Sequence, residues 1–165
     1  MPRSGKTEKI QVAADSIYKS PLVAKLINKV MRDGKKSLAQ KIVYLAFANL
    51  KAQNQDPLAT FEKALENITP RMEVRPRRVG GASYMVPMEV RGSRRQSLAI
   101  TWLVSSARSR LTKDIPDKPK NKPLMVQKLT LELLDAAAGT GRAVAKREEM
   151  HRMAEANKAF SHFRW

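Results

Sequence analysis

The sequence contains no cysteine, two histidines and few aromatic residues, and each shortage excludes a class of chemistry. Without cysteine there can be no disulfide, thiolate zinc site or thiol nucleophile. Only His151 and His162 supply imidazoles, and the chain contains no phosphate-binding glycine loop, nucleophile elbow or HExxH motif. We therefore predict a protein that is not an enzyme and that uses no cofactor and no metal.

Long apolar runs and acidic residues are also scarce. The longest apolar stretch, around residues 42–50, is far too short to span a bilayer, and no lipidation motif occurs. We therefore expect a cytoplasmic protein with no membrane partner. Against 15 Asp and Glu residues the chain has 32 Lys and Arg, which gives a formal net charge of +17 and a pI near 10.5. Such an excess opposes compaction unless a polyanion offsets it, and nucleic acid is the commonest such partner.

The chain length of 165 residues suggests one domain, residues 1–165, with a core of aliphatic side chains. Apolar residues recur at helical spacing after Ser20-Pro21 and after Asp56-Pro57, two pairs typical of a helix start. The pattern predicts six helices. In chain order they begin near residues 21, 36, 57, 93, 126 and 141.

From Met72 the period of the apolar residues changes to two, and Gly80-Gly81 separates two alternating runs. This pattern predicts a β-hairpin over residues 71–91. The predicted fold is mainly α: a six-helix single domain with a protruding two-stranded antiparallel β-ribbon between the third and fourth helices. A lone ribbon is marginal in water and needs a helical base or a ligand.

Other segments complete the expected organisation. Residues 1–18 form a basic N-terminal arm, and residues 112–123, rich in proline and lysine, form an extended basic loop. Residues 141–165 form a C-terminal helix and tail, whose thin apolar stripe would hold it only weakly by packing. Ser93 and Gln96 match a capping box at the start of the fourth helix.

Arginine is concentrated on and beside the predicted ribbon, at Arg75, Arg77, Arg78, Arg91, Arg94 and Arg95. Guanidinium groups match the geometry of phosphate oxygens. An ordinary solvated hairpin is the alternative. We favour nucleic-acid binding, because solubility needs charges of mixed sign rather than a concentration of arginine.

Several further residues have two readings. Lys35 and Lys36 follow Asp33-Gly34 at a helix start, which suits either a phosphate site or a solvated junction equally well. Tyr84 suits base stacking and a plain structural role equally. Trp102, on an apolar helix face, is expected in the core.

Five stretches, taken in order, resemble the bacterial-type small-subunit ribosomal protein seven family over nearly the whole chain. They are DGKK at 33–36, ALENITP at 64–70, RRVGGASYMVPMEV at 77–90, RRQSLAITWLV at 94–104 and KREEMHRMAEANKAFSHFRW at 146–165. The glycine hairpin and the C-terminal run are the most specific of them. Two features depart from the family pattern: Met85 stands where Gln is expected, and the 112–123 loop is longer than the usual connection.

The resemblance implies a structural constituent of the small ribosomal subunit, in the ribosome of the cytoplasm. It further implies a primary binder of the 3′ major domain of the ribosomal RNA that nucleates head assembly, with the β-ribbon near exit-site tRNA and the mRNA path. Ribosomal proteins nine, eleven, thirteen and nineteen are the implied neighbours.

The candidate site residues form two sets. Those expected to bind ribosomal RNA are Arg3, Lys6, Lys25, Lys35, Lys36, Arg75, Arg77, Arg78, Arg91, Arg94, Arg95, Arg108, Arg110 and Lys113. Those expected near tRNA and mRNA are Arg78, Val79, Gly80, Gly81, Ala82, Ser83, Tyr84 and Arg142. A DNA-bending architectural protein also joins a helical body to basic β-arms, and equal affinity for duplex DNA and ribosomal RNA would favour that alternative.

Overall fold

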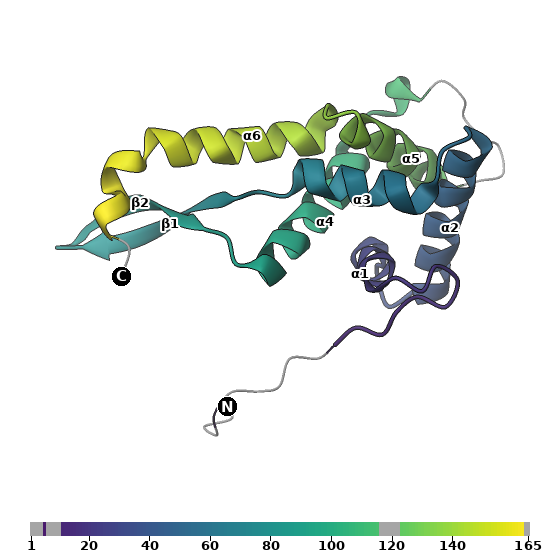
Figure 1. Cartoon of the computed structure of the whole chain (residues 1–165), viewed down its shortest axis with the longest axis horizontal. Helices are drawn as coiled ribbons and strands as arrows, with labels where there is room; N and C mark the ends of the chain where they lie inside the picture. Colours follow the sequence, from purple (N-terminus) through teal and green to yellow (C-terminus); the bar gives the residue numbers. More distant parts are fainter. Residues whose placement is uncertain (1–4, 6–10, 116–122, 164–165) are drawn as a thin grey trace.

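Six α-helices and one β-hairpin make up most of the described chain, which in the computed structural model comprises Gly5 and residues 11–115 and 123–163 (Figure 1). The α-helices are α1 (Pro21–Val30), α2 (Lys36–Ala52), α3 (Pro57–Ile68), α4 (Gly92–Ser109), α5 (Leu124–Ala137) and α6 (Gly141–Ala156). Strands β1 (Met72–Val79) and β2 (Ala82–Glu89) lie between α3 and α4, and short 3-10 helices form η1 (Thr112–Asp114) and η2 (Lys158–Phe163). The mainly α fold with a ribbon between the third and fourth helices is confirmed.

The start of α3 has the N-cap that the sequence predicts, whereas the start of α4 does not. Asp56 caps α3, where its side chain accepts a hydrogen bond of 3.0 Å from the backbone N–H of Leu58. The capping box predicted at Ser93 is wrong, because α4 begins at Gly92 and its N-cap residue is Arg91. The Gln96 amide instead accepts a hydrogen bond of 2.9 Å from Lys25 on α1.

The core includes residues of all six α-helices, with α5 packed against α2, α3 and α4. Phe47, Phe61, Leu103 and Leu129 are fully buried there. Removing one such side chain from water contributes about 1.5–3 kcal/mol to stability. Trp102 is partly buried against this core, in agreement with its predicted role.

The hairpin is closed by Gly80 and Gly81, whose φ angles of +57° and +87° lie in the left-handed region that a two-residue turn requires. The strands pair in regular antiparallel register from Met72 opposite Glu89 to Val79 opposite Ala82. In Figure 1 the ribbon extends away from the helical body while α6 runs along it and η2 folds across it. The helical base that a lone ribbon needs is therefore supplied by the C-terminal segment.

No helix in the described ranges is both long enough and apolar enough to cross a membrane.

Candidate nucleic-acid interface

A buried carboxylate organises the arginines at the base of the ribbon. The two Glu73 oxygens accept hydrogen bonds of 2.6 Å from the Nε atoms of Arg75 and Arg94, one each. The Glu73 side chain is only 4% exposed, whereas the two arginine side chains are 48% and 49% exposed. One negative charge thus holds two guanidinium groups in place and leaves part of each open to solvent, which suits them to phosphate oxygens.

The remaining ribbon arginines continue this positive surface. Arg77 lies opposite Tyr84 across the hairpin and Arg78 opposite Ser83, so these neighbouring arginines point to opposite faces of the ribbon. Arg91, just after β2, is exposed. The Nε of Arg95 donates a hydrogen bond of 2.8 Å to the backbone carbonyl of Val90. The predicted arginines therefore extend from the first turn of α4 along the ribbon, with Arg75 and Arg77 on one face and Arg78 on the other.

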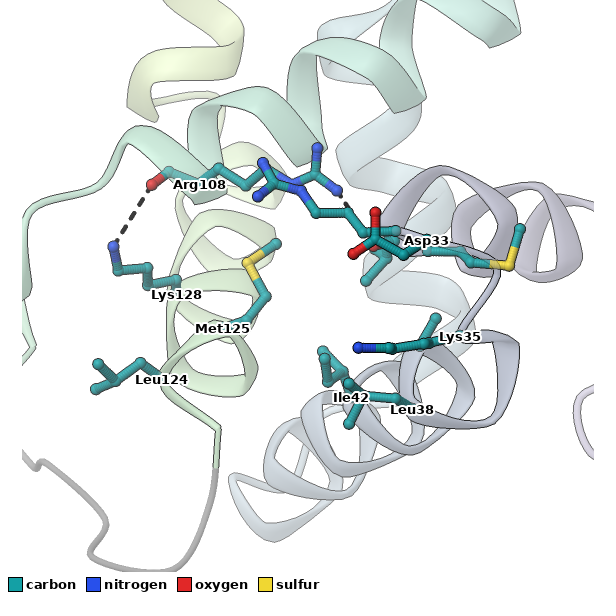
Figure 2. Close-up of a pocket in the computed structure, with 12 residues that line it drawn as sticks. Asp33, Lys35, Leu38, Ile42, Arg108, Leu124, Met125 and Lys128 are labelled. Carbon is teal, nitrogen blue, oxygen red and sulfur yellow. Dashed lines mark hydrogen bonds between the residues drawn. The ribbon is translucent and has the colours of Figure 1, made fainter.

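A second positive site is a groove at the junction of four helix ends, with a volume of about 450 Å³ (Figure 2). The end of α1, the start of α2, the end of α4 and the start of α5 meet there. Arg32, Lys35, Arg108 and Lys128 line the groove, and Asp33 is the acidic residue among its lining. We call this site the basic groove.

The floor of the basic groove is apolar. Leu38 and Ile42 come from α2, and Leu124 and Met125 come from α5 (Figure 2). Leu38 and Leu124 are exposed by 46% and 43%, although both are large aliphatic side chains. An apolar surface surrounded by cations suits an unpaired nucleotide, whose base needs a face to lie on and whose phosphate needs positive charge.

Arg108 is held in the groove by backbone groups. Its Nη2 donates to the carbonyls of Val30 at 3.1 Å and Lys29 at 3.3 Å, at the C-terminal end of α1. Burial lowers the pKa of Arg108, and the positive charge of Arg32 lowers it further. The repulsion between Arg108 and Arg32 would be relieved by an anion bound between them. The electrostatics of the groove therefore favour a phosphate.

The turn before α2 brings Lys35 to the groove. Asp33 and Gly34 have φ angles of +51° and +71°, a left-handed pair that reverses the chain after α1. Lys35 then stands at the N-cap of α2 with its side chain exposed. Lys36 is also exposed but is not part of the groove lining. The structure thus brings Lys35 and Arg108 together and leaves Lys36 apart from them.

Arg110 lies only two residues after Arg108 but faces different groups. Its Nη2 donates to Glu132 at 2.7 Å and also to Asp135. The Arg110 side chain is 12% exposed, and that of Glu132 is fully buried. Burial alone would lower the pKa of Arg110, but hydrogen bonds and charges from Glu132 and Asp135 raise it. The residue therefore has a structural role, and a contact with RNA stays a prediction.

The other predicted residues are dispersed. Lys25 contacts Gln96, Lys113 is exposed in η1, and Arg142 donates a hydrogen bond of 2.8 Å to the backbone carbonyl of Ser109. Tyr84 is half-buried rather than presented freely to solvent. Arg3 and Lys6 lie outside the described residues.

Two of the four cations that line the groove, Arg32 and Lys128, are absent from the predicted set. Arg32 stands in a strongly basic stretch and could have been included on charge alone. Lys128 lies in a segment of low net charge, and its role becomes visible only when α5 packs beside α4.

His151 on α6 connects that helix to the base of the ribbon. Its Nε2 accepts a hydrogen bond of 3.0 Å from the backbone N–H of Arg71, and this requires the neutral imidazole. Burial lowers the pKa of His151, and the charges of Arg147 and Arg71 lower it further. His151 is therefore protonated less readily in the folded state than in the unfolded state.

We predict that this histidine makes the protein less stable in mild acid. Its contribution is fully present above the unfolded histidine pKa of about 6.5 and is lost as pH falls through that value toward the lower folded pKa. Urea unfolding from pH 8 to pH 5 measures the change. His151→Gln, which keeps a non-titrating acceptor, should show a smaller loss than the parent. Equal losses in the two proteins would contradict the prediction.

Comparisons with known proteins give a consistent result. A family model described as "Ribosomal protein S7p/S5e" matches residues 2–158. Curated proteins named "Small ribosomal subunit protein uS7" from Caldanaerobacter subterraneus, Carboxydothermus hydrogenoformans and Dictyoglomus thermophilum are 56%, 55% and 54% identical to this chain. Each alignment covers 100% of this chain and 100% of the relative.

Proposed function

The chain belongs to the ribosomal protein S7p/S5e family, and from this premise we propose that it is a primary binder of the 3′ major domain of small-subunit ribosomal RNA. It is a structural protein of the small subunit of the cytoplasmic ribosome, not an enzyme. Binding of the 3′ major domain nucleates assembly of the subunit head. Ribosomal proteins nine, eleven, thirteen and nineteen are the proposed neighbours.

The basic groove is the observation that carries this proposal. It places four cations around an apolar floor, at a point where ends of four helices meet and fix their geometry. An A-form RNA major groove is too narrow for side chains to read, so such a site suits backbone and unpaired nucleotides of a folded junction. The arginines held by Glu73 provide a second area of contact with the same RNA.

The ribbon tip has a separate proposed task. Residues 78–84 and Arg142 approach exit-site tRNA and the mRNA path. Support comes from the exposure of the turn, where Arg78, Gly80 and Gly81 are open to solvent, and from the family resemblance. Exposed backbone at a glycine turn permits close approach to another chain.

A salt series tests the RNA proposal. Because each neutralised phosphate releases counterions, the logarithm of the affinity should fall linearly with the logarithm of salt concentration, by roughly 0.7–0.9 per contact. Filter binding to a fragment of the 3′ major domain measures this slope, with duplex DNA of equal length as the comparison. A flat response would exclude the mechanism. Equal affinity for the two nucleic acids would favour a DNA-bending protein instead.

A further inference from the structure

Three aromatic rings join the ribbon to the C-terminal segment. The ring centroid of Tyr84 in β2 lies 5.2 Å from that of Phe160 and 5.3 Å from that of Phe163, both in η2. The His162 ring lies a further 4.0 Å from that of Phe163. Tilted rings at these separations attract one another beyond the burial of their area. Tyr84 stands near the glycine turn, so the contact is far from the base of the ribbon (Figure 1).

A second attachment lies at the base. There the Arg71 N–H donates to His151 of α6, as described above, and Glu73 accepts a hydrogen bond from Arg94 at the start of α4. The C-terminal segment therefore contacts the ribbon near its base through α6 and near its tip through η2. A hairpin held only at its base could pivot about that base relative to the helical body. It would also be only marginally stable, as two strands in water are by themselves. Two points of attachment define a direction.

We propose that η2 acts as a clasp: Phe160 and Phe163 hold Tyr84 and so fix the direction in which the ribbon presents its arginines. Tyr84 is then a positioning residue, and its ring serves the protein rather than an RNA base. On this proposal the Tyr84 ring has the structural role, which is one of the two readings that the sequence left equal. The effect on RNA binding, though not the clasp itself, rests on the proposed function.

The clasp would affect RNA binding through pre-organisation. Arg77 lies opposite Tyr84, and Arg75 lies two positions away on the same face of β1. If the ribbon direction is fixed before binding, these arginines meet the RNA without a further loss of freedom. Release of the clasp should weaken binding even though no cation is removed.

The absence of cysteine allows a direct measurement of the ribbon direction. Spin labels are placed at Ser83→Cys, beside the turn of the ribbon, and at Ala48→Cys, an exposed position of α2. The ribbon and α2 lie at opposite ends of the molecule (Figure 1). Electron–electron double resonance on the full-length chain without RNA should give one narrow distance distribution. The double substitution Phe160→Ala with Phe163→Ala should broaden it, while far-ultraviolet circular dichroism shows that the helical body is retained.

Two matched variants make the experiment specific. Tyr84→Phe keeps the ring and should keep the narrow distribution, whereas Tyr84→Ala should broaden it as the phenylalanine variant does. Met85→Ala removes an adjacent apolar side chain on the opposite face of the ribbon and should change nothing. An unchanged distribution in both Tyr84→Ala and the double phenylalanine variant would overturn the clasp.

Binding to the RNA fragment then tests the consequence. The double phenylalanine variant should bind about five-fold more weakly, with the same salt slope as the parent because no phosphate contact is lost. A broadened distribution with unchanged affinity would show that the clasp does not serve RNA binding. Failure of the parent protein to bind the fragment would instead refute the proposed function and leave the distance result standing.

Discussion

Replacing Glu132 with alanine is expected to lower the free energy of unfolding by about 3–5 kcal/mol, because the change removes one partner of a buried charge pair. Glu132 is fully buried and uses both oxygens: Oε2 accepts from Arg110 at 2.7 Å, and Oε1 accepts from the backbone N–H of Ala143 at 2.9 Å. These bonds join the end of α4 to the middle of α5 and the start of α6. Loss of the carboxylate leaves a buried N–H without its acceptor and a guanidinium with one partner fewer.

We call the contact of α4, α5 and α6 around Glu132 the joint, and Gly141 shows how closely it is packed. It has a φ angle of +92°, and a Cβ added there would lie 2.9 Å from Cβ of Asp135 and 3.5 Å from Oε1 of Glu132. The first turn of α6 can approach the carboxylate only because this position has no side chain. The joint therefore depends on the small size of one residue and the charge of another.

Urea denaturation measures the effect of Glu132→Ala as a shift of the midpoint at constant slope. Glu149→Ala, which removes an exposed carboxylate from α6, is the matched control and should change stability by less than about 0.5 kcal/mol. A double-mutant cycle with Arg110→Ala isolates the energy of the pair. A loss below about 1 kcal/mol in Glu132→Ala would show that the joint is not important for stability.

Much of the fold could be predicted from local signals. The Asp56-Pro57 pair predicted the start of α3 because its chemistry is complete within a few residues: Pro57 fits the first turn and Asp56 accepts from Leu58. The turn at Gly80-Gly81 was equally predictable, since few residues other than glycine adopt two successive positive φ angles. The start of α4 was not predictable in this way, because the Gln96 side chain accepts a hydrogen bond from Lys25, which is distant in the sequence.

The site was harder to predict than the fold, because charge in a sequence does not reveal its partners. Arg108 and Arg110 are two residues apart and have the same expected role, yet Arg108 contacts carbonyls beside a groove and Arg110 contacts carboxylates of α5. Lys128 appeared unremarkable in a segment of low net charge and nevertheless lines the groove. Only the packing of α5 against α4 separates these cases.

The second large effect is expected in the groove itself. Neutralising Arg32 and Lys35 together, as Arg32→Gln with Lys35→Gln, should weaken binding to the RNA fragment about 100-fold at low salt. A charge-assisted bond to phosphate contributes about 1.5–3 kcal/mol, and a factor of ten corresponds to about 1.4 kcal/mol. Both side chains are exposed, so the fold should be retained. Arg108 is a poorer choice because its guanidinium also caps α1.

The matched control removes two cations from another part of the surface. Lys51 and Lys63 are exposed and lie in the weakly charged stretch of residues 42–70. Lys51→Gln with Lys63→Gln lowers the net charge equally and should reduce affinity only slightly, by the general loss of attraction. The groove variant should also reduce the salt slope by about 1.5, because two phosphate contacts disappear. Equal losses of affinity in the two double variants would mean that net charge, and not the groove, binds the RNA.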